Sequence, residues 1–178
     1  MRFTETPLAG AFLVDVDPVR DGRGFFARTW CRREMEDRGL DAHVEQCSVS
    51  YNARRGTLRG MHWQAAPHEE TKIVRCSRGA VHDVILDLRP GSPTRARWFA
   101  VELRAHEHRA LYVPAGLAHG FQTLADDTEV AYQMSQPHHP QSARGVRWDD
   151  PAFAIEWPAA PERIVSARDL SYPDWRPC

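Results

Sequence analysis

KIVRCSRGAVHDVILDL, residues 72–88, is the stretch that decides the fold class. Two runs rich in β-branched residues, 72–77 and 81–88, lie on either side of the turn signal Arg78-Gly79. Outward from this stretch the pattern recurs, with Gly, Pro or Asp turn signals between short β-branched and aromatic runs at 11–16, 97–103, 109–113, 119–124 and 129–135. Many short strands at close spacing predict an antiparallel all-β sandwich or barrel.

Helical signals are sparse. One helix is predicted over 32–38, ended by Gly39. The 13 prolines cluster toward the C-terminal end, where we expect irregular wrapping and short peripheral helices. Because no internal repeat or linker interrupts the chain, residues 1–178 are predicted to form a single domain with an irregular C-terminal extension.

Composition excludes several classes of protein. Formal net charge is -1 without a basic block, so a nucleic-acid partner is not expected. No stretch approaches a membrane-spanning length, and residues 1–5 lack the apolar core of a signal peptide. Four cysteines, Cys31, Cys47, Cys76 and Cys178, are scattered without a CxxC pair, which predicts free thiols and a cytoplasmic protein.

Strand alternation predicts which candidate functional side chains lie close together. Residues two apart share a face, which groups Leu58, Gly60, His62 and Gln64, then Lys72, Val74 and Cys76, then Val130, Tyr132 and Met134, and finally His119 and Phe121. In a closed barrel one face of every strand points inward. His62, Lys72, His119 and Tyr132 are therefore predicted to converge in one cavity if these faces are the inner ones.

The residue types at these positions suit proton transfer beside a carbonyl. An imidazole, with an unperturbed pKa of about 6.5, suits a base at neutral pH, and an ammonium group can hold the enolate that forms. Tyr132 could return a proton from the opposite face. The alternatives are structural: a core histidine at 62, a solvated lysine at 72 and a packing tyrosine at 132.

Asp169 has two interpretations. Ser166-x-x-Asp169 is typical of a helix cap, and an acid that orients His62 would suit the same chemistry. Spacing does not decide between them.

A catalytic metal is not expected. Pro114-x-Gly116-x-x-His119 resembles the second cupin motif, yet the first motif, which has two histidines one residue apart, reads His62-Trp63-Gln64 here. Glu69 or Glu70 would have to supply a displaced carboxylate, which makes a poor site for zinc or iron. His119 is then either a buried, hydrogen-bonded histidine or a substrate contact.

From about Phe12 to Pro173, the chain resembles the dTDP-4-dehydrorhamnose 3,5-epimerases, a family that acts on nucleotide-linked 4-keto-6-deoxy sugars. Together and in order the matching segments are highly specific: 21–26 (DGRGFF), 56–64 (GTLRGMHWQ), 72–76 (KIVRC), 118–121 (AHGF), 129–132 (EVAY), 147–151 (RWDDP) and 166–169 (SARD).

The resemblance implies a cupin-type double-stranded β-helix, or jelly roll, that forms a homodimer and needs no metal or other cofactor. It implies His62 as general base paired with Asp169, Tyr132 as general acid, and Lys72 as the group that stabilises the enolate. His119 would contact the sugar. The nucleotide and diphosphate would be held by Arg23, Phe26, Gln46 and Arg59, with part of that pocket supplied by the neighbouring subunit.

The chain departs from the family pattern at substrate-binding positions. Arg28 stands where a glutamate is usual, Gln46-Cys47-Ser48 replaces Gln-x-Asn, His138 replaces an aromatic residue, and Arg168 replaces a lysine with its charge kept. Arg28 and Ser48 fall at positions where the family contacts the nucleobase. There a hydrogen-bond acceptor is lost and a cation is gained. The resemblance therefore does not determine the base.

We expect an isomerase of deoxysugar biosynthesis, as in a dTDP-rhamnose-like pathway. It would invert C3, C5 or both in a nucleotide-linked 4-keto-6-deoxyhexose of the dTDP-4-dehydro-6-deoxyglucose type. Three alternatives stay open at this point: a single-carbon epimerase on another nucleotide carrier, a metal-dependent cupin enzyme, and a non-catalytic nucleotide-sugar binding module.

Overall fold

Two antiparallel β-sheets face each other in the computed structural model, which describes residues 1–176. The first sheet has the strand order β1 (Arg2–Glu5), β2 (Phe12–Asp15), β10 (Ala110–Val113), β7 (Lys72–Arg78), β12 (Thr128–Met134) and β5 (Gln46–Asn52). The second has the order β13 (Ala143–Gly145), β6 (Thr57–Gln64), β11 (Leu117–Thr123), β8 (Ala80–Asp87) and β9 (Trp98–Arg104), and β14 (Ile164–Val165) pairs with β6 in parallel.

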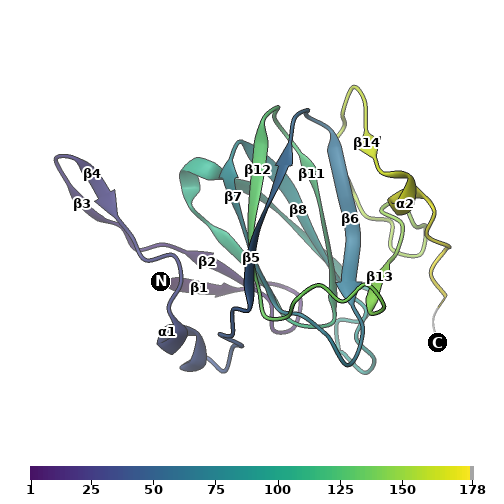
Figure 1. Ribbon diagram of the computed structural model, residues 1–178, viewed down its shortest axis with the longest axis horizontal. Coiled ribbons are helices and arrows are strands. Elements are labelled where there is room, and N and C mark those ends of the chain that lie inside the picture. Colours follow the sequence, from purple (N-terminus) through teal and green to yellow (C-terminus); the bar gives the residue numbers. More distant parts are fainter. Residues whose placement is uncertain (177–178) are drawn as a thin grey trace.

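The chain alternates between the two sheets. From β5 to β13 nearly every connection crosses from one sheet to the other, with β8 and β9 as neighbours in the second sheet (Figure 1). This is the jelly-roll arrangement of cupins, so the predicted fold class is confirmed. Each predicted strand run coincides with an observed strand to within two residues at either end.

The helices are short and peripheral. α1 (Arg32–Glu36) ends two residues earlier than the predicted 32–38, because the N–H groups of Arg38 and Gly39 bond three residues back, to Met35 and Glu36. Gly39 then turns the chain with a φ of 67°. A single 3-10 turn (Ala105–Glu107) and α2 (Ala167–Leu170) complete the helical content of the described chain.

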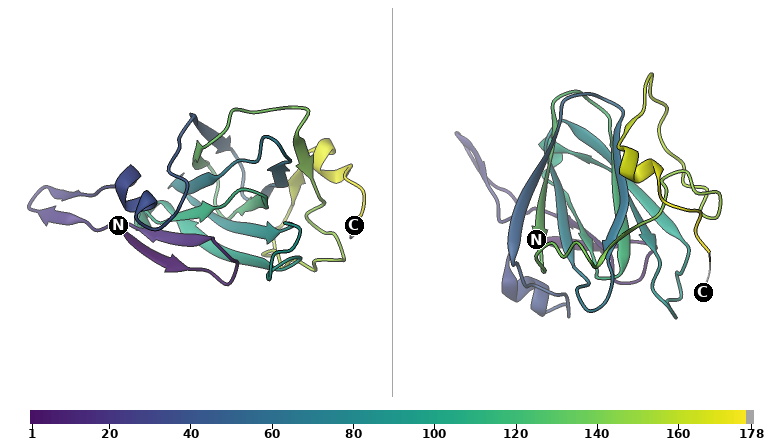
Figure 2. Two further views of the ribbon diagram at one scale, coloured as in Figure 1. Left: turned by 90° about the horizontal axis from the view of Figure 1, so that it is seen from below. Right: turned by 45° about the vertical axis from the view of Figure 1, so that its right-hand side comes forward.

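Along each strand, alternate side chains point into the space between the two sheets. Some of these inward side chains form an apolar core, and others line a cavity. Val74 of β7, Val130 of β12, and Val81 and Ile85 of β8 are fully buried against one another. On the outside, the C-terminal segment covers the second sheet, where Phe153 packs in a cluster with buried outward-facing residues of β6 and β8. In the right-hand view of Figure 2 this yellow segment comes forward, with α2 against β6.

A hairpin of β3 (Val19–Asp21) and β4 (Gly24–Phe26) projects away from the sheets at the N-terminal side (Figure 1). Its residues are exposed along their whole length. No helix of the described chain has the length and apolarity to cross a membrane. Cys31, Cys47 and Cys76 are free thiols, and Cys178 lies outside the described residues.

Two glycines allow β6 and β11 to approach closely. Gly60 has a φ of 133°, and a Cβ there would lie 2.5 Å from the Cα of Gly120. A Cβ on Gly120 would lie 2.8 Å from the Arg59 carbonyl oxygen. The register of the strands shifts beside this contact, and His62 faces His119 across the ladder. The glycine pair therefore sets the relative positions of both histidines.

Replacing Gly60 by alanine is expected to lower the free energy of unfolding by roughly 2–4 kcal/mol, because the added methyl group meets backbone and φ is unsuited to an L side chain. Urea unfolding followed by tryptophan fluorescence measures this. Gly22→Ala is the matched control, since nothing lies within 4 Å of the added Cβ in the exposed hairpin. A Gly60→Ala midpoint equal to that of Gly22→Ala would contradict the close-approach argument.

Candidate active site

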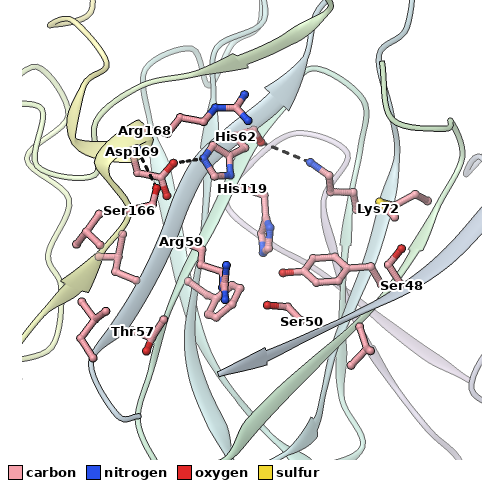
Figure 3. A pocket seen from close by; sticks show the side chains of 17 residues that line it. Ser48, Ser50, Thr57, Arg59, His62, Lys72, His119, Ser166, Arg168 and Asp169 are labelled. Carbon is pink, nitrogen blue, oxygen red and sulfur yellow. Dashed lines mark hydrogen bonds and ion pairs between the residues drawn. The ribbon is translucent and has the colours of Figure 1, made fainter. Parts of the chain in front are cut away.

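A cavity of about 620 Å³ opens between the two sheets. The second sheet supplies His62 and Arg59 from β6 and His119 from β11, while the first supplies Lys72 from β7 and Tyr132 from β12. Figure 3 shows Lys72 and Ser48 across the cavity from Arg59 and the C-terminal residues Ser166 to Asp169. The predicted convergence of His62, Lys72, His119 and Tyr132 is thus found in one space.

His62 is held by Asp169. Its Nε2–H donates to Oδ1 of Asp169 at 2.7 Å, and the other carboxylate oxygen accepts the Gly60 N–H at 3.3 Å. Asp169 is buried, whereas the His62 side chain is 40% exposed. Nδ1 of His62 has no hydrogen-bond partner within residues 1–176, which leaves it as the ring nitrogen able to accept a proton.

The carboxylate of Asp169 stays ionised despite its burial. Burial alone would raise its pKa, but the hydrogen bond and charge of His62 and the Gly60 N–H together lower the pKa below its usual value. An ionised acceptor keeps the Nε2 proton on His62 and stabilises the imidazolium that forms when Nδ1 is protonated. The pair has the arrangement of a base and its orienting acid.

Both interpretations of Asp169 hold, because they use different atoms. The backbone N–H of Asp169 donates to the Ser166 hydroxyl at 3.1 Å, which caps α2 at its N-terminus. The side chain remains free to accept from His62. The cap therefore orients the short helix that delivers the carboxylate to β6.

Lys72 is buried and paired. Its side chain is 9% exposed, and Nζ lies 2.9 Å from Oε1 of Glu70. Nζ also donates to the backbone carbonyl of His62 at 3.4 Å, across the gap between the sheets (Figure 3). A charged ammonium group is thus fixed inside the cavity beside the strand that carries the histidine.

His119 forms a second histidine–carboxylate pair. Its Nε2–H donates to both oxygens of Asp83, at 2.9 and 3.0 Å. Asp83 is fully buried on β8, and His119 is 5% exposed. The ring of Tyr132 meets the His119 ring edge-on, with centroids 5.9 Å apart. His119 is therefore both a hydrogen-bonded buried histidine and a cavity wall, which unites its two sequence interpretations.

The Tyr132 phenol is held in its protonated form. Burial raises its pKa well above the ordinary range, and the nearby charge of Asp83 raises it further, while the charge of Arg59 acts in the opposite direction. No residue of the described chain hydrogen-bonds to the hydroxyl. The phenol is thus protonated and available in the cavity, on the sheet opposite His62.

Two arginines in the cavity lack a carboxylate partner among residues 1–176. Arg59 donates to the side-chain oxygen of Asn52 at 2.8 Å, and Arg168 donates to the hydroxyl of Tyr172 at 3.1 Å. Lys72, His62 and His119, in contrast, each pair with an acid. The uncompensated positive charge of the cavity therefore lies on these two guanidinium groups.

Several residues predicted to bind substrate lie elsewhere. Ser48, by contrast, lines the cavity together with Arg59, His119 and Arg168. Outside the cavity are Arg23 and Phe26 on the hairpin, Arg28, Gln46 and His138. Phe26 is 78% exposed, and the exposed Arg28 pairs with Glu34 at 2.7 Å.

Sequence reasoning missed two carboxylates. Asp83 has no role in the sequence analysis, although it and Asp87 are two acids inside the mostly apolar run 81–88, where a carboxylate needs a partner. Glu70 enters the sequence analysis only as a candidate metal ligand, although it lies two residues before Lys72, on the same face of an extended chain. Both acids pair with cavity cations.

Gln64 occupies the place of the second histidine of a metal-binding cupin motif. Its amide donates to the carbonyls of His68 and Pro137, at 3.0 and 3.2 Å, and accepts the His139 N–H. The side chain is thus committed to two loops at the end of β6. No group of three or more His, Cys, Asp or Glu side chains spaced for a metal ion occurs within residues 1–176.

Comparison with known proteins gives a consistent result. A family model described as dTDP-4-dehydrorhamnose 3,5-epimerase matches residues 5–176. The chain is 40% identical over 177 residues to a dTDP-4-dehydrorhamnose 3,5-epimerase of Sinorhizobium fredii, with 97% of this chain and 89% of that protein covered.

Solved structures agree. The dTDP-4-dehydrorhamnose 3,5-epimerase of Bacillus anthracis with TDP and PPi bound superposes with a TM-score of 0.93 at 38% identity, over 98% of this chain and 99% of that one. ChmJ, a 3′-monoepimerase of Streptomyces bikiniensis in complex with dTDP-quinovose, superposes with a TM-score of 0.88 at 34% identity, over 95% and 85%. The resemblance found in the sequence is confirmed, and the chain belongs to the dTDP-4-dehydrorhamnose 3,5-epimerase family of isomerases.

Proposed function

We propose that this protein epimerises a nucleotide-linked 4-keto-6-deoxyhexose of the dTDP-4-dehydro-6-deoxyglucose type, at C3, at C5 or at both, through an enolate. The observation that carries the proposal is the placement of a histidine–carboxylate pair on one sheet and a protonated phenol on the facing sheet. Inversion of a carbon needs that arrangement, because one group removes the proton and another delivers it to the opposite face.

His62 is the base of the reaction. Asp169 fixes the imidazole through Nε2, so Nδ1 takes the proton from the carbon beside the C4 ketone. The ionised carboxylate stabilises the imidazolium product of that step, which supports the direction of transfer.

Lys72 holds the negative charge that develops on the C4 oxygen. A hydrogen beside a ketone is only weakly acidic, so the base needs a cation at the oxygen. Burial strengthens that interaction, because the effective dielectric is lower than in water. Glu70 keeps the ammonium group in place beside the His62 carbonyl.

Tyr132 returns the proton. The raised pKa keeps the phenol protonated at neutral pH, and the hydroxyl has no competing partner within the described chain. Because β12 and β6 belong to facing sheets, proton delivery comes from the side opposite to removal. His119, fixed by Asp83, contacts the sugar between these groups.

Arg59 and Arg168 bind the diphosphate. Their guanidinium groups are the cavity cations without a carboxylate partner among residues 1–176, and guanidinium forks match phosphate oxygens. The similar B. anthracis enzyme was solved with TDP and PPi bound, which supports a diphosphate-bearing ligand.

We further propose a homodimer in which each nucleotide pocket is shared. The expected nucleotide-binding residues Arg23 and Phe26 sit on a hairpin that projects away from their own cavity. Large exposed apolar side chains lie on this hairpin and on the edge strand β5: Val19, Phe25, Phe26, Val49 and Tyr51. A second copy would cover this apolar surface and receive the hairpin at its cavity mouth.

The free thiols fit a cytoplasmic location.

Inversion of a single carbon is the second candidate. The similarity to the 3′-monoepimerase ChmJ supports this candidate, since the same acid and base serve inversion of one carbon or of two. A metal-dependent cupin reaction is less well supported, because Gln64 is turned to loop carbonyls.

The proposed reaction predicts that solvent deuterium enters dTDP-4-keto-6-deoxyglucose beside the ketone. NMR or mass spectrometry reads the label at C3 and C5 separately, which distinguishes double from single epimerisation. His62→Ala is expected to slow incorporation about 10²- to 10⁴-fold. If wild-type protein incorporates no label at either carbon on any of several nucleotide carriers, the proposed function is wrong.

Tyr132→Phe is expected to uncouple proton exchange from inversion. His62 still removes the proton and can return solvent deuterium to the same face, so label enters unreacted substrate while epimer formation falls about 10²- to 10⁴-fold. The ratio of labelled substrate to labelled epimer is the measurement. Equal losses of exchange and inversion would show that the phenol is not the acid on the opposite face.

The shared pocket predicts complementation between inactive subunits. Co-expression of Phe26→Ala and His62→Ala chains with different affinity tags allows isolation of the mixed dimer. One of its two cavities then combines an intact His62 with an intact hairpin, so it should recover about half of the wild-type activity. Mixed dimers no more active than the parent variants would place each hairpin at its own cavity.

A further inference from the structure

Tyr172 lies directly behind the histidine of the cavity. It follows α2 and its C-cap residue Ser171, and it does not line the cavity itself. The centroid of its ring lies 6.1 Å from that of His62, with the two planes at 64°. Its hydroxyl accepts a hydrogen bond from Nε of Arg168 at 3.1 Å. One side chain thus contacts both the imidazole and a cavity guanidinium.

A glycine makes room for this ring. A Cβ on Gly145 would lie 2.2 Å from Cζ and 2.3 Å from Cε2 of Tyr172. The φ of Gly145 is not positive, so its backbone conformation does not require glycine. The residue is also the Cα partner of His62 on β13. The space beside the histidine is therefore kept free of a side chain and filled by the tyrosine.

The histidine needs a second constraint. Asp169 fixes Nε2, but the His62 side chain remains 40% exposed, and one hydrogen bond leaves the ring free to tilt about that contact. An edge-on aromatic neighbour restricts that tilt. The Arg168 guanidinium is also held by one side chain: within residues 1–176 its side-chain hydrogen-bond partner is the Tyr172 hydroxyl.

We propose that Tyr172 is a positioning residue of the epimerase, with two separable tasks. Its ring keeps the His62 imidazole in the orientation that directs Nδ1 at the substrate. Its hydroxyl directs Arg168 toward the diphosphate at the cavity mouth. The inference rests on the proposed function, because it assigns these two groups to proton transfer and to phosphate binding.

Packing of the C-terminal segment is the structural alternative for Tyr172, and that segment has other anchors. Asp174 pairs with Arg147 at 3.0 Å, and the Trp175 N–H donates to Asp150 at 2.6 Å. The Trp175 ring also packs against Phe153, with centroids 5.1 Å apart. Because these contacts lie beyond Tyr172, the segment stays docked when the tyrosine is truncated.

Separate substitutions test the two tasks. Tyr172→Phe removes only the hydroxyl, so KM for the nucleotide sugar is expected to rise about 3- to 10-fold with kcat little changed. Tyr172→Ala also removes the ring, so kcat is expected to fall about 10- to 100-fold, because the base is no longer aligned. Recovery of kcat by phenylalanine assigns that effect to the ring.

Tyr112→Phe is the matched control. Its hydroxyl accepts the Asp41 N–H at 2.9 Å, its ring packs with Met35 of α1, and it does not line the cavity, so loss of the hydroxyl should lower the melting temperature without changing KM or kcat. If Tyr172→Phe and Tyr172→Ala behave like Tyr112→Phe, with stability lost and kinetics retained, Tyr172 is a packing residue and the inference is overturned.

A double-mutant cycle gives a second route should Tyr172→Ala fold poorly. Gly145→Ala alone is expected to lower kcat by displacing the ring, whereas Gly145→Ala in the Tyr172→Ala background should add little further loss. Additive losses would overturn the link between the two positions. These measurements need an active wild type, so a wild type without exchange refutes the proposed function, while wild-type-like kinetics of Tyr172→Ala refute this inference alone.

Discussion

The contact between Gly60 and Gly120 is the constraint on which the rest of the cavity depends. Backbone meets backbone where β6 and β11 pair, and no side chain of any size fits between Gly60 and Gly120. This contact places His62 opposite His119 beside the register shift. Once those two rings are placed, the remaining groups follow from the opposite sheet, because β7 and β12 present Lys72 and Tyr132 to the same space.

The charges of the cavity are arranged in two classes. His62, Lys72 and His119 each have an acid beside them, and these acids, Asp169, Glu70 and Asp83, are largely screened from solvent. Groups assigned to the diphosphate have no such acid within the described chain. A polyanionic ligand is therefore attracted to the guanidinium side, while the paired groups stay fixed and lose little orientation when substrate enters.

Much of this site could be predicted from the sequence, because strand alternation is a local property. The faces of β6, β7, β11 and β12 follow from residues two apart, and so the convergence of His62, Lys72, His119 and Tyr132 was predictable. The double role of Asp169 was not, since a cap and a histidine partner use different atoms of one residue. Contacts between residues far apart in the sequence, such as Asp83 with His119 on the neighbouring strand or Tyr172 with Gly145, cannot be paired from a local pattern. The hairpin that carries Arg23 and Phe26 is a further case. The sequence identifies these two residues, but the direction in which the hairpin projects from the sheets depends on tertiary packing.

Lys72 is the single lysine of this chain, and its ammonium group is enclosed beside Glu70. The amine of Met1 is likewise enclosed, between Asp17 and Glu34. Acylating agents and reducing sugars that modify primary amines therefore find no lysine on the outer surface, where arginine supplies the positive charge. Spontaneous acetylation or glycation would here have Lys72, the group proposed to bind the enolate, as its sole lysine target.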